Sequence, residues 1–307
     1  MSRGHRQLAS VAARGLLGAG AARIAYSVLT RRPPGGQRPW SRTNHRGEPV
    51  TLLEGPAVAA GAVAAVLVRG LRSRPGAVIA LAGAGAAAFG TYDDLAGSGA
   101  RRGLRGHLGA LLHGEVTTGA VKLGGIGATG LVSAALAGGQ PADVVINAGL
   151  IAGGANLLNL FDLRPGRAIK VGAASGALIA AGGGAGEVAA PLGAALALLP
   201  DDLGERAMLG DAGANALGAM LGAAAAGALS RPARLALLAG IAALTGASEV
   251  VSFTKVIERT PPLRWLDMLG RRPARSPGMT VTSPRRDPGL AAIATARSEK
   301  NKDRTDQ

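Results

Sequence analysis

Long stretches without a charged residue or a histidine dominate the chain, and they constrain its fold more than any other feature. A helix needs about 20 apolar residues to cross the hydrocarbon core of a bilayer, and several of these stretches approach or reach that length. The uncharged stretches cover residues 75–92, 123–142, 144–161, 171–186, 188–200, 212–230 and 235–248. Two less regular apolar segments, 8–30 and 56–68, are counted as further predicted spans. The pattern predicts an all-α, polytopic membrane bundle of about nine transmembrane helices.

Small residues support this prediction. The chain has 49 glycines and only 2% aromatic residues, whereas a soluble core of this size normally needs larger side chains. Between membrane helices, small residues let the backbones approach closely. They recur at a spacing of four, as in Ala82, Ala86 and Gly90. Because the chain has no cysteine, disulfides and thiolate metal sites are excluded.

The basic residues predict an orientation in the membrane. The net charge is +15, and most Lys and Arg residues fall in segments between alternate spans. Since cytoplasmic loops carry the excess of Lys and Arg, the N-terminus is predicted outside and the C-terminus in the cytoplasm. This distribution favours membrane lipids as partners and gives no reason to expect nucleic acid. Arg69, Arg72 and Arg74, on the predicted outer side, do not follow the rule.

Three regions are predicted along the chain. Residues 8–251 form a membrane-embedded domain, which makes the chain a multi-pass protein of the plasma or inner membrane. Residues 252–270 mix apolar and charged side chains and are predicted to form a cytoplasmic interfacial segment. Residues 271–307 are rich in Arg, Pro, Ser and Lys, which predicts a disordered basic tail.

The chain has only 19 acidic residues, and several fall at the predicted cytoplasmic ends of spans. These are Asp93 with Asp94, Asp162, Asp201 with Asp202, and Asp211. Carboxylates at membrane depth are costly unless they pair, bind a cation or meet water. The alternative is that they are solvated or cap helices, as an aspartate at a helix start often does. Carboxylates with amides suit Mg²⁺ or Mn²⁺ bound together with substrate phosphates.

Basic residues accompany the acidic groups. Lys122 lies in an otherwise uncharged predicted span, where it either balances the acidic groups and touches a phosphate or extends toward lipid headgroups. Arg164, Arg167 and Lys170 follow Asp162, and they either meet a pyrophosphate or only set the topology.

Short motifs with these residues follow one another between about residues 40 and 225. They are Asn44-His45-Arg46-Gly47, Thr91-Tyr92-Asp93-Asp94, Lys122, Asn156-x-x-Asn159-x-x-Asp162 and Leu209-Gly210-Asp211-Ala212-Gly213. The ordered set resembles the polyprenyl-phosphate N-acetylhexosamine-1-phosphate transferases (glycosyl transferase family 4). This group includes the phospho-N-acetylmuramoyl-pentapeptide transferase of peptidoglycan synthesis.

The resemblance implies a reaction and a set of roles. A sugar-1-phosphate would pass from a UDP-linked aminosugar to a polyprenyl phosphate at the cytoplasmic face, with release of UMP, in cell-envelope glycan synthesis. The implied cofactor is Mg²⁺, with Mn²⁺ as the alternative, and the implied partners are the UDP-sugar and the polyprenyl phosphate. The implied residues are Asp93, Asp94, Asp162 and Lys122 for catalysis, Asp211 and Asp94 for the metal, and Asn44, Asn156, Asn159, Arg164 and Arg167 for substrate binding.

The chain also departs from the family pattern. The family continues its N-x-x-N-x-x-D motif as G-x-D-G, but Leu163 to Gly166 supply no second aspartate, and no histidine follows His113. These differences motivate a second hypothesis, a catalytically inactive relative that binds polyprenyl phosphate or cell-wall enzymes as a scaffold or regulator. A small transporter is a third and less favoured hypothesis, because the acidic residues gather at one face rather than at mid-depth. The donor sugar, and the choice between a monomer and a homodimer, stay open.

Overall fold

The computed structural model describes residues 2–70, 73–97, 109–110 and 113–273, and most of these are helical. The first five long helices are α1 (Arg3–Arg31), α2 (Glu54–Gly70), α3 (Arg74–Ala96), α5 (Thr118–Ala137) and α6 (Pro141–Phe161). The next are α7 (Arg167–Ile179), a π-helical turn η2 (Ala180–Gly184), α8 (Ala185–Leu203), α9 (Gly210–Ala228) and α10 (Arg231–Ser248). Two short helices follow, α11 (Phe253–Arg259) and α12 (Pro261–Met268).

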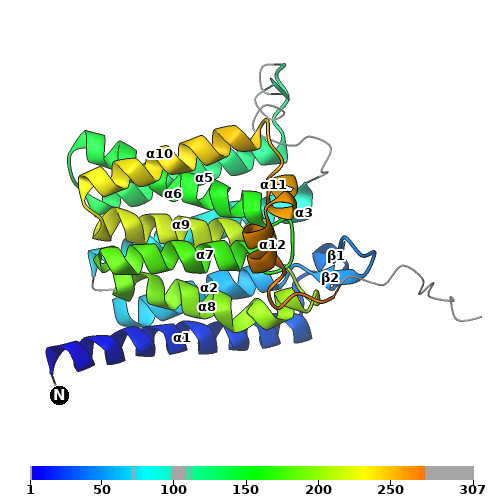
Figure 1. Cartoon of the computed structure of the whole chain (residues 1–307), viewed down its shortest axis with the longest axis horizontal. Helices are drawn as coiled ribbons and strands as arrows, with labels where there is room; N and C mark the ends of the chain where they lie inside the picture. The colour runs from blue at the N-terminus through cyan, green and yellow to red at the C-terminus, as the bar shows by residue number, and fades with distance from the viewer. Residues whose placement is uncertain (1, 71–72, 98–108, 111–112, 274–307) are drawn as a thin grey trace, which may run out of the picture. The chain divides into compact units, whose positions relative to one another are not determined.

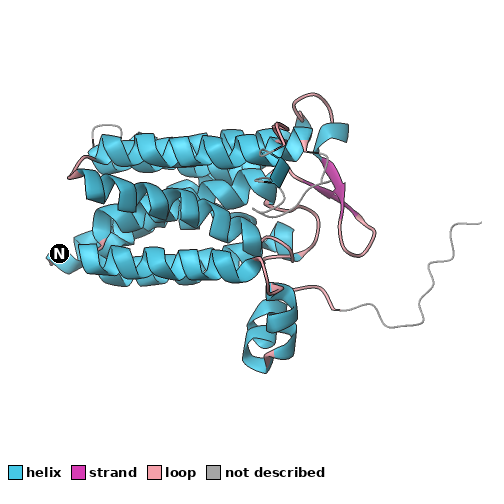
Figure 2. Cartoon of the chain, turned by 90° about the horizontal axis from the view of Figure 1, so that it is seen from above, coloured by secondary structure: helices cyan, strands magenta, loops and turns pink. Residues whose placement is uncertain are grey.

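The long helices lie side by side, and their connections gather at two ends of the bundle (Figure 1). One end carries the hairpin of strands β1 (Ser41–Thr43) and β2 (Pro49–Thr51), together with α11 and α12, in both views (Figures 1 and 2). It is called the hairpin end below, and the other, where α1 begins, the opposite end. All the predicted acidic groups lie at or next to helix ends at the hairpin end of the bundle. This arrangement is expected when successive helices cross the membrane in opposite directions.

Five helical segments are long and apolar enough to cross a membrane, or six if the bent pair α10–α11 is one span. They are α1 from Gly4, α3, α5, α6 and the segment Arg167–Leu203. That last segment is not one straight helix, because Gly183 has a φ of 103° and separates α7 from α8. Each of the nine predicted apolar stretches overlaps a helix within the described residues, so the prediction of an all-helical membrane protein is confirmed. The nine crossings and the sides on which the termini lie stay predictions.

Small residues bring α9 into close contact with its neighbours. Most of α9 is buried, and α3 and α6 pack against it. A methyl group added to Gly218 would overlap the carbonyl of Gly154, and one added to Gly222 would overlap that of Leu150. The backbones of α6 and α9 are therefore in direct contact, which only small side chains permit.

The all-α prediction left out a short β-hairpin at the hairpin end. Strand β1 (Ser41–Thr43) pairs antiparallel with β2 (Pro49–Thr51), and Thr51 bridges to Ala207 in the loop before α9. Strands of three residues are too short to show an alternating pattern in the sequence. The hairpin matters because it ties the loop 32–53 to the start of α9.

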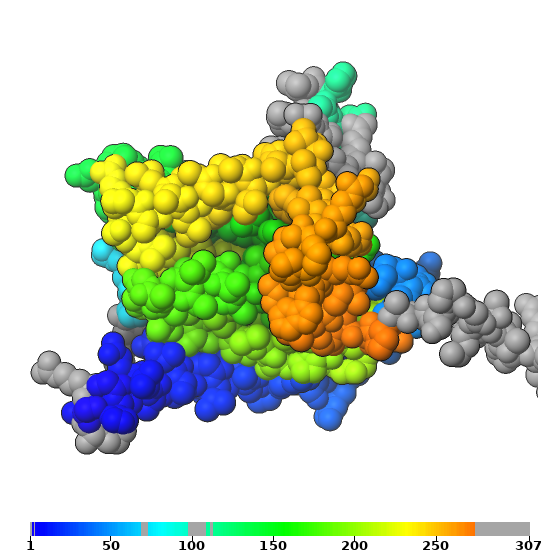
Figure 3. Space-filling model, in the orientation of Figure 1, coloured from blue at the N-terminus to red at the C-terminus, as the bar shows by residue number. Residues whose placement is uncertain are grey.

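The segment after α10 packs against the rest of the chain at the hairpin end (Figure 3). Met1–Arg272 form one compact unit. This unit contains both the predicted membrane domain, residues 8–251, and the predicted interfacial segment, residues 252–270. At the start of the predicted disordered tail, Arg271 pairs with Asp267 at 2.7 Å and Arg272 pairs with Glu48 at 2.5 Å. The remainder of that predicted tail, residues 274–307, lies outside the described residues.

Candidate functional site

A lysine bridges two carboxylates from different helices at the hairpin end. Lys122 of α5 places its Nζ 2.6 Å from Oδ2 of Asp211 in α9 and 2.7 Å from Oδ2 of Asp93 in α3. The lysine and Asp93 side chains are about 15% exposed and that of Asp211 is 25% exposed. The ammonium thus neutralises carboxylates that would otherwise repel each other in a largely dehydrated place.

Asn159 holds the other oxygen of Asp211. Its Nδ2 donates a hydrogen bond to Asp211 Oδ1 from the last turn of α6. Each oxygen of Asp211 therefore has its own donor, one charged and one neutral. Two partners from two helices fix the carboxylate in one orientation, as a positioned functional group requires.

Asp94 caps the helix that carries Asp211. Its Oδ1 accepts the N–H of Asp211 at 3.1 Å and its Oδ2 accepts that of Ala212 at 2.9 Å. The residue that precedes α9 makes no side-chain hydrogen bond to the helix. The carboxylate from α3 therefore accepts hydrogen bonds from the free N–H groups at the start of α9, and its negative charge lies at the positive end of the helix dipole. The guanidinium of Arg42 donates to the carbonyl of Asp94 and links the hairpin to this cap.

A second set of carboxyls lies buried beside this cluster. Glu54, at the start of α2, is fully buried, and neither of its carboxyl oxygens has a hydrogen-bond partner within the described residues. Asp202, at the end of α8, is 2% exposed and its Oδ2 also has none there. Burial raises the pKa of the Asp162 carboxyl well above its usual range, and the neighbouring Asp202 and Asp211 act in the same direction. Acidic side chains therefore accumulate around the end of α6, where burial favours the neutral form of Asp162.

Sequence reasoning missed Glu54 and did not assign Asp202 a role. The available signal was an acid directly before the apolar stretch 56–68 in a chain with few acids. Asp201, by contrast, is neutralised by Arg23 at 2.6 Å and Arg206 at 2.9 Å.

Most of the predicted substrate-binding residues contact other groups. Asn44 donates to Glu205 at 3.0 Å, while its Oδ1 accepts backbone N–H groups of the hairpin turn. Asn156 donates to Thr245 of α10 at 3.4 Å, and Arg164 lies 3.9 Å from Glu258. Of the five predicted substrate-binding residues, only Asn159 contacts Asp211.

Arg167 is committed to a buried ion pair. It donates to both oxygens of Asp267 in α12, at 2.7 and 3.1 Å, and to Thr254 of α11 at 3.0 Å. Burial alone would raise the pKa of the Asp267 carboxyl, but hydrogen bonds from Arg167 and the charges of Arg271 and Lys170 hold it below its usual value. Arg167 therefore anchors α11 and α12 rather than pointing at the acidic cluster.

The residues of the cluster fit a cation that arrives with a phosphate substrate. Within the described part of the chain, no three His, Cys, Asp or Glu side chains form a group able to hold a metal together. Mg²⁺ usually takes one or two carboxylates and completes its shell with water and substrate phosphates. Asp211 and Asp93 are two such carboxylates, and Asp94 lies next to them. Both oxygens of Asp211 accept from Lys122 and Asn159, and both oxygens of Asp94 accept backbone N–H groups, so a cation held by either residue would take the place of one of these donors.

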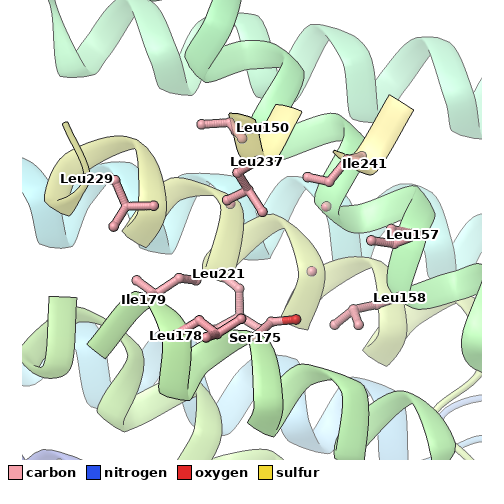
Figure 4. A pocket seen from close by; sticks show the side chains of 13 residues that line it. Leu150, Leu157, Leu158, Ser175, Leu178, Ile179, Leu221, Leu229, Leu237 and Ile241 are labelled. Carbon is pink, nitrogen blue, oxygen red and sulfur yellow. The ribbon is translucent and has the colours of Figure 1, made fainter. Parts of the chain in front are cut away.

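An apolar pocket of about 150 Å³ lies in the bundle between α6, α7, α9 and α10. Leu178 and Ile179 of α7 face Leu237 and Ile241 of α10 across it (Figure 4). Leu158 also lines it and directly precedes Asn159 in α6, so the pocket adjoins the helix turn that reaches the cluster.

No family model matches the chain, and no curated protein is significantly similar to it in sequence.

Proposed function

We propose that the protein transfers a sugar-1-phosphate from a UDP-linked aminosugar to a polyprenyl phosphate, releasing UMP. The observation that carries this proposal is the cluster in which Lys122 and Asn159 hold Asp211 beside Asp93 and Asp94. The ordered motifs that resemble the polyprenyl-phosphate transferases contribute every one of these residues. The reaction would serve cell-envelope glycan synthesis.

The proposed topology places the cluster at the cytoplasmic face of the cell membrane. Nine long helices would cross the bilayer, with the N-terminus outside and the hairpin end in the cytoplasm. The basic segments around residues 31–50 and 252–272 support this orientation, because cytoplasmic loops carry the excess of Lys and Arg.

The proposed step exchanges one phosphoanhydride bond for another. An oxygen of the lipid phosphate attacks the phosphorus that carries the sugar. A new P–O bond forms while the bond from that phosphorus to the bridging oxygen breaks, and the electron pair leaves on UMP. A phosphate monoester is largely ionised at neutral pH, so the nucleophile needs little help from a base. The main requirements are charge neutralisation and in-line placement.

The residues of the cluster match these requirements. Lys122 offsets the negative charge of the two substrates, and Asp93 and Asp94 position the lipid phosphate. Asn159 and Asp162 orient the nucleotide. Mg²⁺, or Mn²⁺ in its place, would be held by Asp211 and would neutralise pyrophosphate oxygens when bound. Part of the polyprenyl chain would lie in the apolar pocket between α6 and α10.

Purified protein with undecaprenyl phosphate and a panel of UDP-aminosugars tests the proposal. We expect Mg²⁺-dependent release of UMP from at least one donor, and loss of release in Asp211→Asn. Glu258→Gln, a carboxylate change at the same end but outside the cluster, should keep wild-type turnover. No release with any donor, at a protein level where a transferase of the family is active, would rule the proposal out.

A non-catalytic relative is the second candidate. It is favoured by the missing second aspartate after Asp162 and by the lysine that already neutralises Asp93 and Asp211. Such a protein would bind polyprenyl phosphate or cell-wall enzymes without turnover. Binding of radiolabelled lipid phosphate that depends on Lys122, together with no UMP release, would select this candidate over the enzyme.

A further inference from the structure

Two cavities lie side by side near the opposite end of the bundle, away from the acidic cluster. Their volumes are about 250 and 190 Å³, and both are lined by Pro75, Ile79 and Glu187. A water molecule accounts for about 30 Å³ of liquid volume, so each cavity has room for more than one. Together they surround the first turns of α3 and α8.

The charges that line these cavities are not paired with one another. Within the described residues, Glu187 and Arg74 have no hydrogen-bond or ion-pair partner. Arg14 of α1 lines the second cavity with Glu187 and donates to the carbonyl of Gly186 at 3.1 Å, but its buried Nε has no partner. Two arginines, Arg14 and Arg74, and one carboxylate, Glu187, therefore line the two cavities without forming ion pairs with one another.

Arg74 belongs to the basic residues that do not follow the positive-inside pattern. Arg74 is exposed, whereas Glu187 and Arg14 are partly buried between helices. Ionisable side chains buried inside a membrane protein are costly, and those that are retained usually pair or bind a ligand. A ligand with one negative and one positive group would satisfy both arginines and the glutamate. Apolar walls from Val78, Ile79 and Ile151 adjoin these charges in the larger cavity, which fits a ligand that is also apolar.

We propose that these cavities bind a phospholipid whose headgroup carries a primary ammonium, as phosphatidylethanolamine does. Arg14 and Arg74 contact the phosphate, and Glu187 accepts hydrogen bonds from the ammonium. The acyl chain lies along the apolar wall. The site is independent of the transfer reaction proposed for the hairpin end.

Lipid binding to purified full-length protein tests the site. Native mass spectrometry would compare phosphatidylethanolamine, phosphatidylcholine and phosphatidylglycerol with the same acyl chains. We expect phosphatidylethanolamine to bind at least about tenfold more tightly than the other two, since only it presents an N–H donor to Glu187 and a phosphate to the arginines. Glu187→Gln should remove this preference, and Arg74→Gln should weaken binding of all three lipids.

Arg231→Gln is the matched control, because Arg231 lies at the same end, outside both cavities, and pairs with Asp143 at 3.5 Å. It should bind all three lipids as the wild type does. Equal binding of the three lipids, an unchanged preference in Glu187→Gln, or equal effects of Arg74→Gln and Arg231→Gln would overturn the proposal. If Glu187→Gln does not fold, Arg74→Gln decides, since Arg74 is exposed and unchanged binding in that variant overturns the proposal as well.

Discussion

At the scale of single residues, Lys122 has the most informative contacts. Its ammonium lies within 2.7 Å of both Asp93 and Asp211, so it does what a bound cation would do in the absence of substrate. A buried ion pair is weak evidence for stability, because proteins in which apolar residues replace all its partners are often just as stable. In the proposed function, these three charges from three helices meet where the charged substrates bind.

Replacing Lys122 with methionine tests this role. The variant leaves Asp93 and Asp211 close together without a counter-ion and removes a charge from the proposed phosphate site. We expect turnover to fall by about 10²-fold or more, the usual cost of losing one preorganised electrostatic contact, and the melting temperature to fall as well. UMP release and a thermal melt in detergent measure the two effects. Lys255→Met, at an exposed position of α11, is the control, and wild-type turnover in Lys122→Met would contradict the proposed role.

Part of the site could be predicted from sequence, because position on a helix decides which end a residue reaches. The order of the spans predicts Asp93 and Asp211 at the same end, and there both carboxylates contact Lys122, while Asn159 donates to Asp211. Partner choice was not predictable: Arg167 pairs with a carboxylate 100 residues later in the chain. No local pattern specifies such a contact, since it depends on where α12 packs.

At the scale of helices, the contact between α6 and α9 explains the abundance of glycine. The backbones of the two helices touch where Gly154 of α6 faces Gly218 of α9.

The position of each helix could be predicted from the uncharged stretches, but the number of helices that cross a membrane could not. Glycine and alanine contribute little hydrophobicity, so α9, with Asp211 in its first turn, does not qualify as a span by composition although most of it is buried.

Two glycine-to-alanine substitutions in α9 distinguish the effect of close packing on stability from the effect of helix propensity. Gly218→Ala places a methyl group against the carbonyl of Gly154 and should destabilise the fold by about 1–3 kcal/mol, the usual cost of overpacking. Gly227→Ala meets no atom within 4 Å and should be neutral or stabilise the helix by up to about 1 kcal/mol. Thermal melts of both variants provide the measurement. A lower melting temperature for Gly227→Ala than for Gly218→Ala would contradict the packing described.

The pair α11–α12 should detach at acid pH. The pKa of Asp267 lies below its usual value in the folded protein, so its ion pairs stabilise the docked helices above the unfolded-state pKa of about 4. That stabilisation is lost as the pH falls through the lower, folded-state pKa. Hydrogen exchange, corrected for intrinsic rates, should rise in residues 253–268 of the wild type below about pH 4. In Asp267→Asn it should already be fast at pH 6, and equal protection there would show that the ion pair does not hold these helices.

At the scale of the whole molecule, the two ends of the bundle differ in chemistry. The hairpin end gathers the carboxylates with Lys122, Asn159 and the α11–α12 pair. The opposite end holds two cavities lined by Arg14, Arg74 and Glu187. If the helices cross the membrane as proposed, the two sites face different leaflets, one for phosphate transfer and one for a structural lipid.

Thiol labelling tests the proposed orientation without background, because the chain has no cysteine. Thr43 lies in the hairpin, and Ser230 lies between α9 and α10 at the opposite end. In intact cells, a membrane-impermeant maleimide should label Ser230→Cys but not Thr43→Cys, which should react only after permeabilisation. The reverse pattern would place the acidic cluster outside the cell, where UDP-sugars are scarce.

The proposed transfer can be followed through the phosphate group that moves. A UDP-aminosugar labelled with ³²P at the sugar-linked phosphorus would be incubated with the protein, Mg²⁺ and undecaprenyl phosphate, and the label then partitioned into organic solvent. Wild-type protein should move the label into the lipid fraction while unlabelled UMP is released, and Asp211→Asn should not. Label that stays in the aqueous phase with every donor, or that moves equally well with Asp211→Asn, would rule out the proposed transfer.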